Sequence, residues 1–104
     1  MIKVYDKAQW HIDAGEESSF VVAKFKAIFQ FLDSKDLLSD EGKEIMEVGI
    51  DSSISLHERM VTDKGRDFLE VCYDRIINIR TDEITDALNI EFDHYIDIYY
   101  HKEQ

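Results

Sequence analysis

The sequence predicts a mostly α-helical, single compact domain of about four to five helices, and it allows one short β element around residues 52–61. Two observations favour helices. Proline is absent and glycine occurs only four times in 104 residues, so the residues that favour tight turns between strands are scarce. Apolar residues also recur every three or four positions over several long stretches. The length fits one domain, which we assign to residues 1–104.

The first segment combines signals for a strand and a turn. Ile2 and Val4 alternate with polar neighbours, which predicts a short strand. We expect Asp6 to cap the turn that follows, which carries Trp10 and His11.

The longest apolar pattern predicts a central helix that begins after an N-cap at Ser18 or Ser19 and runs to about Lys35. One face of this helix carries Val21, Phe25, Ile28 and Leu32. Phe20 and Phe31 are expected on the far side. A helix that is apolar over so much of its circumference is usually contacted from two sides, so we expect it to organise the core.

The middle of the chain predicts a short helix followed by an extended segment. The run from Ser39 to Gly42 places a cap before a helix from residue 40 to residue 48, which Gly49 ends. Ile54 and Leu56 then alternate with polar residues. This alternation favours a strand or an extended loop over a helix.

Two helices are predicted in the last third. Thr62 is expected to cap one that extends to about Ile77 and carries Cys72 on its apolar side. The second begins at Thr81 or Asp82. Its apolar face carries Ile84, Ala87, Leu88, Phe92, Tyr95 and Tyr99.

Charge and composition exclude several classes of function. With 12 Lys and Arg against 23 Asp and Glu, the formal net charge is −11, which argues against nucleic acid as a partner because its phosphates would be repelled. No apolar run approaches the roughly 20 residues that span a bilayer, so no membrane partner is expected. The opening residues lack the apolar centre of a signal peptide, and there is a single cysteine. We therefore expect a cytoplasmic protein without an internal disulfide.

No metal, cofactor or catalytic site is predicted. The four histidines and Cys72 form neither a C-x-x-C nor an H-x-x-x-H pair, the short spacings that usually nucleate a zinc site. Because Cys72 lies on an apolar helical face, we expect a buried and unreactive thiol. The sequence carries no nucleophile elbow and no phosphate-binding glycine loop, which favours a protein that is not an enzyme.

An acidic face on the last predicted helix is the most unusual feature of the sequence. Asp86, Asp93 and Asp97 recur at spacings of seven and four, and residues 81–101 include no lysine or arginine. One interpretation is a solvated face that keeps the protein in solution. The other is a docking surface for a basic protein partner, to which Tyr100 would add contact area.

The pair Trp10 and His11 also has two interpretations. In the structural one, Trp10 closes the edge of the core, and His11 forms a hydrogen bond with a backbone or carboxylate partner. In the functional one, Asp6, Trp10 and His11 form a candidate polar pocket, in which Asp13 and Glu16 join Asp6 as the acidic groups around His11.

Several short motifs support a family resemblance. They are Tyr5-Asp6-x-Ala8-x-Trp10-His11, Phe29-x-Phe31-Leu32 with Leu37-Leu38, Met60-x-Thr62, and Phe68-Leu69-x-x-x-Tyr73-Asp74. Together they resemble a family of small uncharacterised bacterial domains over most of residues 4–75. The resemblance implies no catalytic residues. In size and acidity, the chain also resembles the immunity proteins that bacteria pair with secreted toxins.

These observations favour a non-catalytic protein-binding domain. A sharper hypothesis is an immunity-type inhibitor whose acidic surface covers the basic site of a toxin. One alternative is a small enzyme or ligand-binding protein with a pocket near Trp10 and His11. Another is a self-associating structural domain that forms a homo-oligomer.

Overall fold

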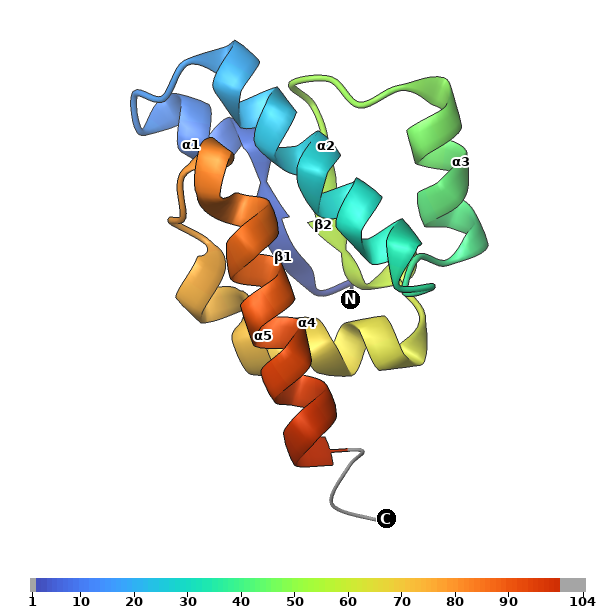
Figure 1. Ribbon diagram of the computed structural model, residues 1–104. Coiled ribbons are helices and arrows are strands. Elements are labelled where there is room, and N and C mark those ends of the chain that lie inside the picture. The colour runs from blue at the N-terminus through green and yellow to red at the C-terminus, as the bar shows by residue number, and fades with distance from the viewer. Residues whose placement is uncertain (1, 100–104) are drawn as a thin grey trace.

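The computed structural model describes residues 2–99 as five helices and a two-stranded sheet, which confirms the predicted fold class (Figure 1). In chain order the elements are β1 (Val4–Lys7), α1 (Ala8–Asp13), α2 (Ser18–Ser34), α3 (Asp40–Val48), β2 (Ser55–His57), the 3₁₀ turn η1 (Glu58–Met60), α4 (Asp63–Ile76), the 3₁₀ turn η2 (Thr81–Glu83) and α5 (Ile84–Tyr99). None of the helices within residues 2–99 combines the length and apolar character needed to cross a membrane.

Helix α2 is the centre of the fold, as its apolar circumference predicted. It contacts α1, α3, η2 and α5 (Figure 1). Phe25, Ile28 and Leu32 are fully buried on the expected face. Phe20 and Phe31, which were expected on the far side, differ in burial: Phe20 is exposed, whereas Phe31 is buried. Rings of α4 and α5 cover this side of α2, with Phe92 at 5.9 Å between ring centroids.

The starts of α3 and α4 follow the sequence signals closely. The Ser39 hydroxyl accepts the backbone N–H of Gly42 at 3.2 Å, and the Thr62 hydroxyl accepts that of Gly65 at 3.1 Å. Both glycines are needed for close packing. A Cβ at Gly42 would lie 2.2 Å from the carbonyl oxygen of Met60, and one at Gly65 would lie 2.7 Å from another backbone carbonyl oxygen.

Two other helix starts differ from the predictions. The N-cap of α2 is Glu17 rather than Ser18 or Ser19, and no side-chain hydrogen bond caps it. At the last helix, Thr81 begins η2, and the α-helix starts only at Ile84. The Thr81 hydroxyl donates a hydrogen bond to a backbone carbonyl of α2 at 2.8 Å. Thr81 therefore contacts α2 and does not begin the α-helix.

The β element expected around residues 52–61 is β2, which pairs antiparallel with β1. The partners are Val4 with His57, Asp6 with Leu56, and Lys7 with Ser55, and the register shifts between Val4 and Asp6. Because of this irregularity, consecutive residues Tyr5 and Asp6 are both buried, which a regularly alternating strand does not allow. Asp6 is therefore a strand residue and not the expected helix cap, and Lys7 is the N-cap of α1.

The core closes where α4 and α5 meet α2. Edge-to-face ring contacts join Phe68 to Phe92 at 5.3 Å and to Tyr95 at 5.6 Å between centroids. Cys72 is buried in the same core, as predicted. Burial raises the pKa of its thiol to about 12, which keeps it protonated and unreactive at neutral pH.

Candidate functional site

The face of α5 that points away from the core carries three acidic residues and one isoleucine. The opposite side of the helix buries Ile84, Leu88 and Tyr95. Asp86, Ile90, Asp93 and Asp97 follow one another at spacings of four, three and four, so they share one side of the helix. We call these four residues the outer face of α5. Ile90 is 66% exposed and is one of several large apolar residues that reach solvent.

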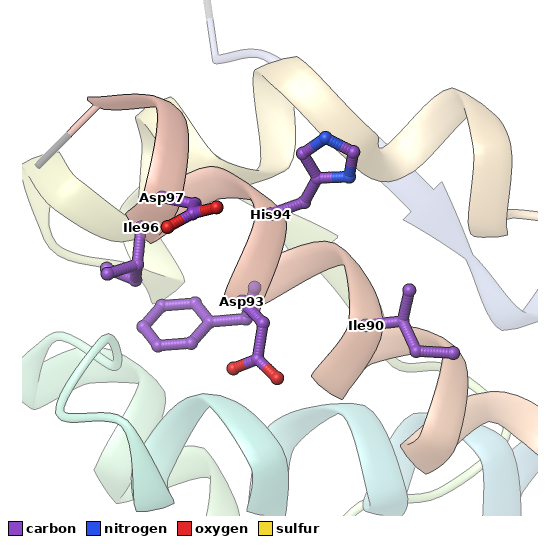
Figure 2. A pocket seen from close by; sticks show the side chains of 6 residues that line it. Ile90, Asp93, His94, Ile96 and Asp97 are labelled. Carbon is purple, nitrogen blue, oxygen red and sulfur yellow. The ribbon is translucent and has the colours of Figure 1, made fainter. Parts of the chain in front are cut away.

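A shallow, open hollow of about 670 Å³ lies along this helix. It is lined by Ile90, Phe92, Asp93, His94, Ile96 and Asp97. Figure 2 shows that the Asp93 and His94 side chains point in different directions from the helix, so the lining of the hollow is not confined to the outer face of α5. Both apolar and acidic side chains therefore border this hollow, with Phe92 and Ile96 partly buried against the core.

The electrostatic character of the outer face of α5 is acidic. Residues 81–101 contain no lysine or arginine. Within residues 2–99, no hydrogen bond or ion pair engages the side chains of Asp86 and Asp93. The nearest ion pair between helices joins Arg75 of α4 to Glu91 at 2.6 Å, and its hydrogen bonds lower the pKa of Glu91. That pair neutralises a different side of α5.

The structure brings together only some of the residues that the sequence suggested for partner binding. Asp93 and Asp97 both line the hollow, whereas Asp86 is exposed on the same helix outside it. Tyr100 lies outside the described residues. Sequence reasoning missed Ile90, although a signal was present, because an isoleucine two positions after the buried Leu88 must face away from the core.

A second cluster of ionisable groups is buried where β1, α1 and α4 meet. The Asp6 side chain is 0% exposed, and both of its oxygens lie 2.9 Å from Nε2 of His11. The Tyr73 hydroxyl donates to Asp6 Oδ2 at 2.6 Å, and the backbone N–H of Lys7 donates to Oδ1 at 2.8 Å. Nδ1 of His11 lies 2.9 Å from Glu16 Oε2. We call Asp6, His11, Glu16 and Tyr73 the buried polar network, although Glu16 reaches the surface.

Burial and nearby carboxylates shift the pKa values of two groups in or beside the buried polar network, Tyr73 and Lys24. Burial raises the pKa of Tyr73 well above its usual value, and the nearby Asp6 carboxylate raises it further. Lys24 of α2 is also buried, and its ammonium donates to the carbonyl oxygen of Ile77 at 2.7 Å. Burial lowers the pKa of Lys24, while Asp6 and Glu16 act in the opposite direction. Every buried side-chain polar atom within residues 2–99 has a hydrogen-bond partner, as expected of a network that holds the fold together.

Trp10 does not close the core, contrary to the structural interpretation of the Trp10–His11 pair. Helix α1 turns Ala8 and His11 inward, and Trp10 is therefore directed outward, where it is 49% exposed beside the Lys7 ammonium. The other half of that interpretation is confirmed, because His11 forms hydrogen bonds with carboxylates. Of the three residues suggested for a pocket, Asp6 and His11 are buried and paired, while Trp10 lies on the surface.

The described residues contain no group of three or more histidine, cysteine or acidic side chains arranged to hold a metal ion. Comparisons with protein-family models, curated proteins and solved structures found no match to this chain.

Proposed function

We propose that this chain is a non-catalytic binding domain that docks a basic protein partner on the outer face of α5. The observation that carries the proposal is the position of the exposed Ile90 between Asp86 and Asp93, on one accessible face with a hollow beside it. Ile90 lines the hollow together with Phe92, Ile96 and two carboxylates, so apolar and acidic groups occur side by side there. A docking surface uses such an apolar group as a contact that is buried when the partner binds.

The two kinds of side chain would contribute to different steps of binding. The carboxylates, on a chain with a net charge of −11, attract a basic surface and accelerate the encounter. Apolar contacts with Ile90 and Ile96 would slow dissociation, because burying them removes apolar surface from water.

A sharper form of the proposal is an immunity-type inhibitor that covers the basic active site of a cognate toxin. Enzymes that cleave nucleic acids need basic groups to bind phosphates, so an acidic protein can occlude such a site. Its single, buried thiol suits action in a reducing compartment such as the cytoplasm.

The proposal is tested with a defined probe, a synthetic amphipathic helical peptide that carries lysines four residues apart beside a leucine stripe. Association and dissociation rates are measured at low and at physiological salt, with wild type and with the triple variant Asp86→Asn/Asp93→Asn/Asp97→Asn. We expect the triple variant to associate about tenfold more slowly at low salt, with a smaller difference at physiological salt. The control variant Asp33→Asn/Glu44→Gln/Glu47→Gln removes the same charge from exposed positions of α2 and α3, and it should associate nearly as fast as wild type.

A second variant tests the apolar contact. Ile90→Ser should leave the association rate nearly unchanged and increase the dissociation rate several-fold, because the charge is retained while the buried apolar area is lost. If the association rate fell equally in the triple variant and in the control variant, the net charge of the protein alone would explain the effect. That result, or unchanged rates at both salt concentrations, would refute docking on the outer face of α5.

A further inference from the structure

A second hollow, of about 440 Å³, lies where the loop between α1 and α2, the start of α2 and the η2 turn meet. It is lined by Glu16, Phe20, Arg80, Thr81 and Asp82. The hydrogen bond from the Thr81 hydroxyl to the carbonyl oxygen of Phe20, at 2.8 Å, joins two walls of this hollow. Its lining thus comes from segments about 60 residues apart in the chain, and it is held by a specific contact.

The side chains of this hollow fit a cation. The Phe20 side chain is 62% exposed, so the face of its ring is accessible for a cation–π contact. The carboxylates of Glu16 and Asp82 are both more than half exposed. Arg80 pairs with Asp82 at 3.3 Å, but both side chains are largely exposed, and such pairs contribute little. A ligand cation therefore competes for the Asp82 carboxylate with the Arg80 guanidinium, which also lines the hollow but is held only by this weak, exposed pair.

Glu16 connects this hollow to the interior. Its Oε2 atom lies 2.9 Å from Nδ1 of the buried His11, whose other nitrogen lies 2.9 Å from Asp6. This contact holds the Glu16 carboxylate in place before any ligand arrives, which lowers the entropic cost of binding. A cation that binds to Glu16 should also change the environment of the His11 ring, because the two side chains share a hydrogen bond.

We propose that this hollow binds a small organic cation, an ammonium or guanidinium compound with an attached apolar group. The cation lies against the Phe20 ring and pairs with Glu16 and Asp82, and the apolar group fills the remaining space. The volume is within the range of small-molecule sites. The site uses no residue of the outer face of α5, so it is independent of the proposed function.

The test uses isotope-labelled full-length chain and nuclear magnetic resonance, with benzylamine as the probe. Benzyl alcohol and phenylacetate, which are neutral and anionic compounds of similar shape, are the matched controls. We expect benzylamine to cause saturable shifts of the Glu16, Phe20 and Thr81 amides and of the His11 ring signals. Phe20→Ala and Asp82→Asn should each weaken its affinity roughly threefold. The variant Asp93→Asn/Asp97→Asn should bind benzylamine as wild type does.

Glu16→Gln removes the charge that contacts His11, and this variant should both weaken binding and abolish the response of the His11 ring. If it fails to fold, the exposed positions Phe20 and Asp82 still decide the question. Equal shifts with benzyl alcohol, absence of saturation with benzylamine, or unchanged affinity in both Phe20→Ala and Asp82→Asn would overturn the proposal.

Discussion

The buried polar network and the outer face of α5 use the same carboxylate group in opposite surroundings. The Asp6 carboxylate is fully buried and forms hydrogen bonds with Tyr73, with His11 and with a backbone N–H. The carboxylates of Asp86 and Asp93 face solvent, and no side chain within residues 2–99 forms a hydrogen bond or ion pair with them. Desolvation makes the loss of one partner costly for the first kind of acid, whereas the second kind stays accessible at the surface.

This comparison separates stability from recognition. Removing a member of a buried, paired cluster leaves the remaining polar groups without partners in a medium that solvates them poorly. Removing an exposed carboxylate changes little except the electric field outside the protein. Four measurements test this contrast.

The largest effect is expected for Asp6→Asn. The amide keeps the size of the side chain but removes the charge that faces His11 and Tyr73, so the free energy of unfolding should fall by about 3–5 kcal/mol. Urea denaturation measures this loss, with Asp86→Asn as the matched control for the same chemical change at the surface. A loss below about 0.5 kcal/mol in Asp6→Asn would mean that the buried polar network does not hold the fold together.

The second effect is a loss of stability at alkaline pH. Burial raises the pKa of Cys72 from 9.0 to about 12, and burial together with Glu70 raises that of Tyr5 from 10.0 to about 12. Between pH 9 and 12 the folded state therefore holds protons that the unfolded chain has released. As the pH rises through this range, each such group lowers the free energy of unfolding by up to about 1.4 kcal/mol per pH unit. Below the pKa that the group has in the unfolded chain, both states are protonated and no stability is lost.

Urea denaturation between pH 8 and pH 11 measures this dependence. Cys72→Ala should flatten the slope that begins near pH 9, because the alanine carries no titrating group. An identical slope in the variant would contradict the buried, protonated thiol, and so would labelling of native Cys72 as fast as that of the unfolded chain.

A smaller effect is expected at Trp10. Because half of its surface remains in water, Trp10→Ala should cost about 1 kcal/mol or less, against about 3–5 kcal/mol for Phe68→Ala in the core. Its fluorescence emission should be close to that of a solvent-exposed indole. A strongly blue-shifted emission together with a loss as large as that of Phe68→Ala would place Trp10 inside the core.

The smallest effect on folding is expected for the triple variant Asp86→Asn/Asp93→Asn/Asp97→Asn. Its free energy of unfolding should lie within about 0.5 kcal/mol of wild type, with a slight gain from the removal of like charges on one helix face. Thermal and urea denaturation measure this directly. A loss of more than about 1 kcal/mol would show that these carboxylates help to hold the fold, and the contrast with Asp6 would fail.

The local elements can be predicted from the sequence alone. The spacing of apolar residues located α2, α4 and α5, and Ser39 and Thr62 located the starts of two helices to the residue. These signals are readable because a helix places residues three and four apart on one face, and because capping bonds span only three residues. The acidic side of the last helix was likewise visible in the sequence, since its members lie within three turns.

Which polar and aromatic residues are buried depends on tertiary contacts. Asp6 and Tyr73 are 67 positions apart, and the register shift in β1 that turns Asp6 inward depends on β2. Phe31 is buried because α4 and α5 cover it, and Trp10 is exposed because α1 turns Ala8 and His11, and not Trp10, toward the core. Burial is a property of what packs against a residue. A helical pattern specifies which residues share a face, but only the neighbouring elements decide whether that face is covered.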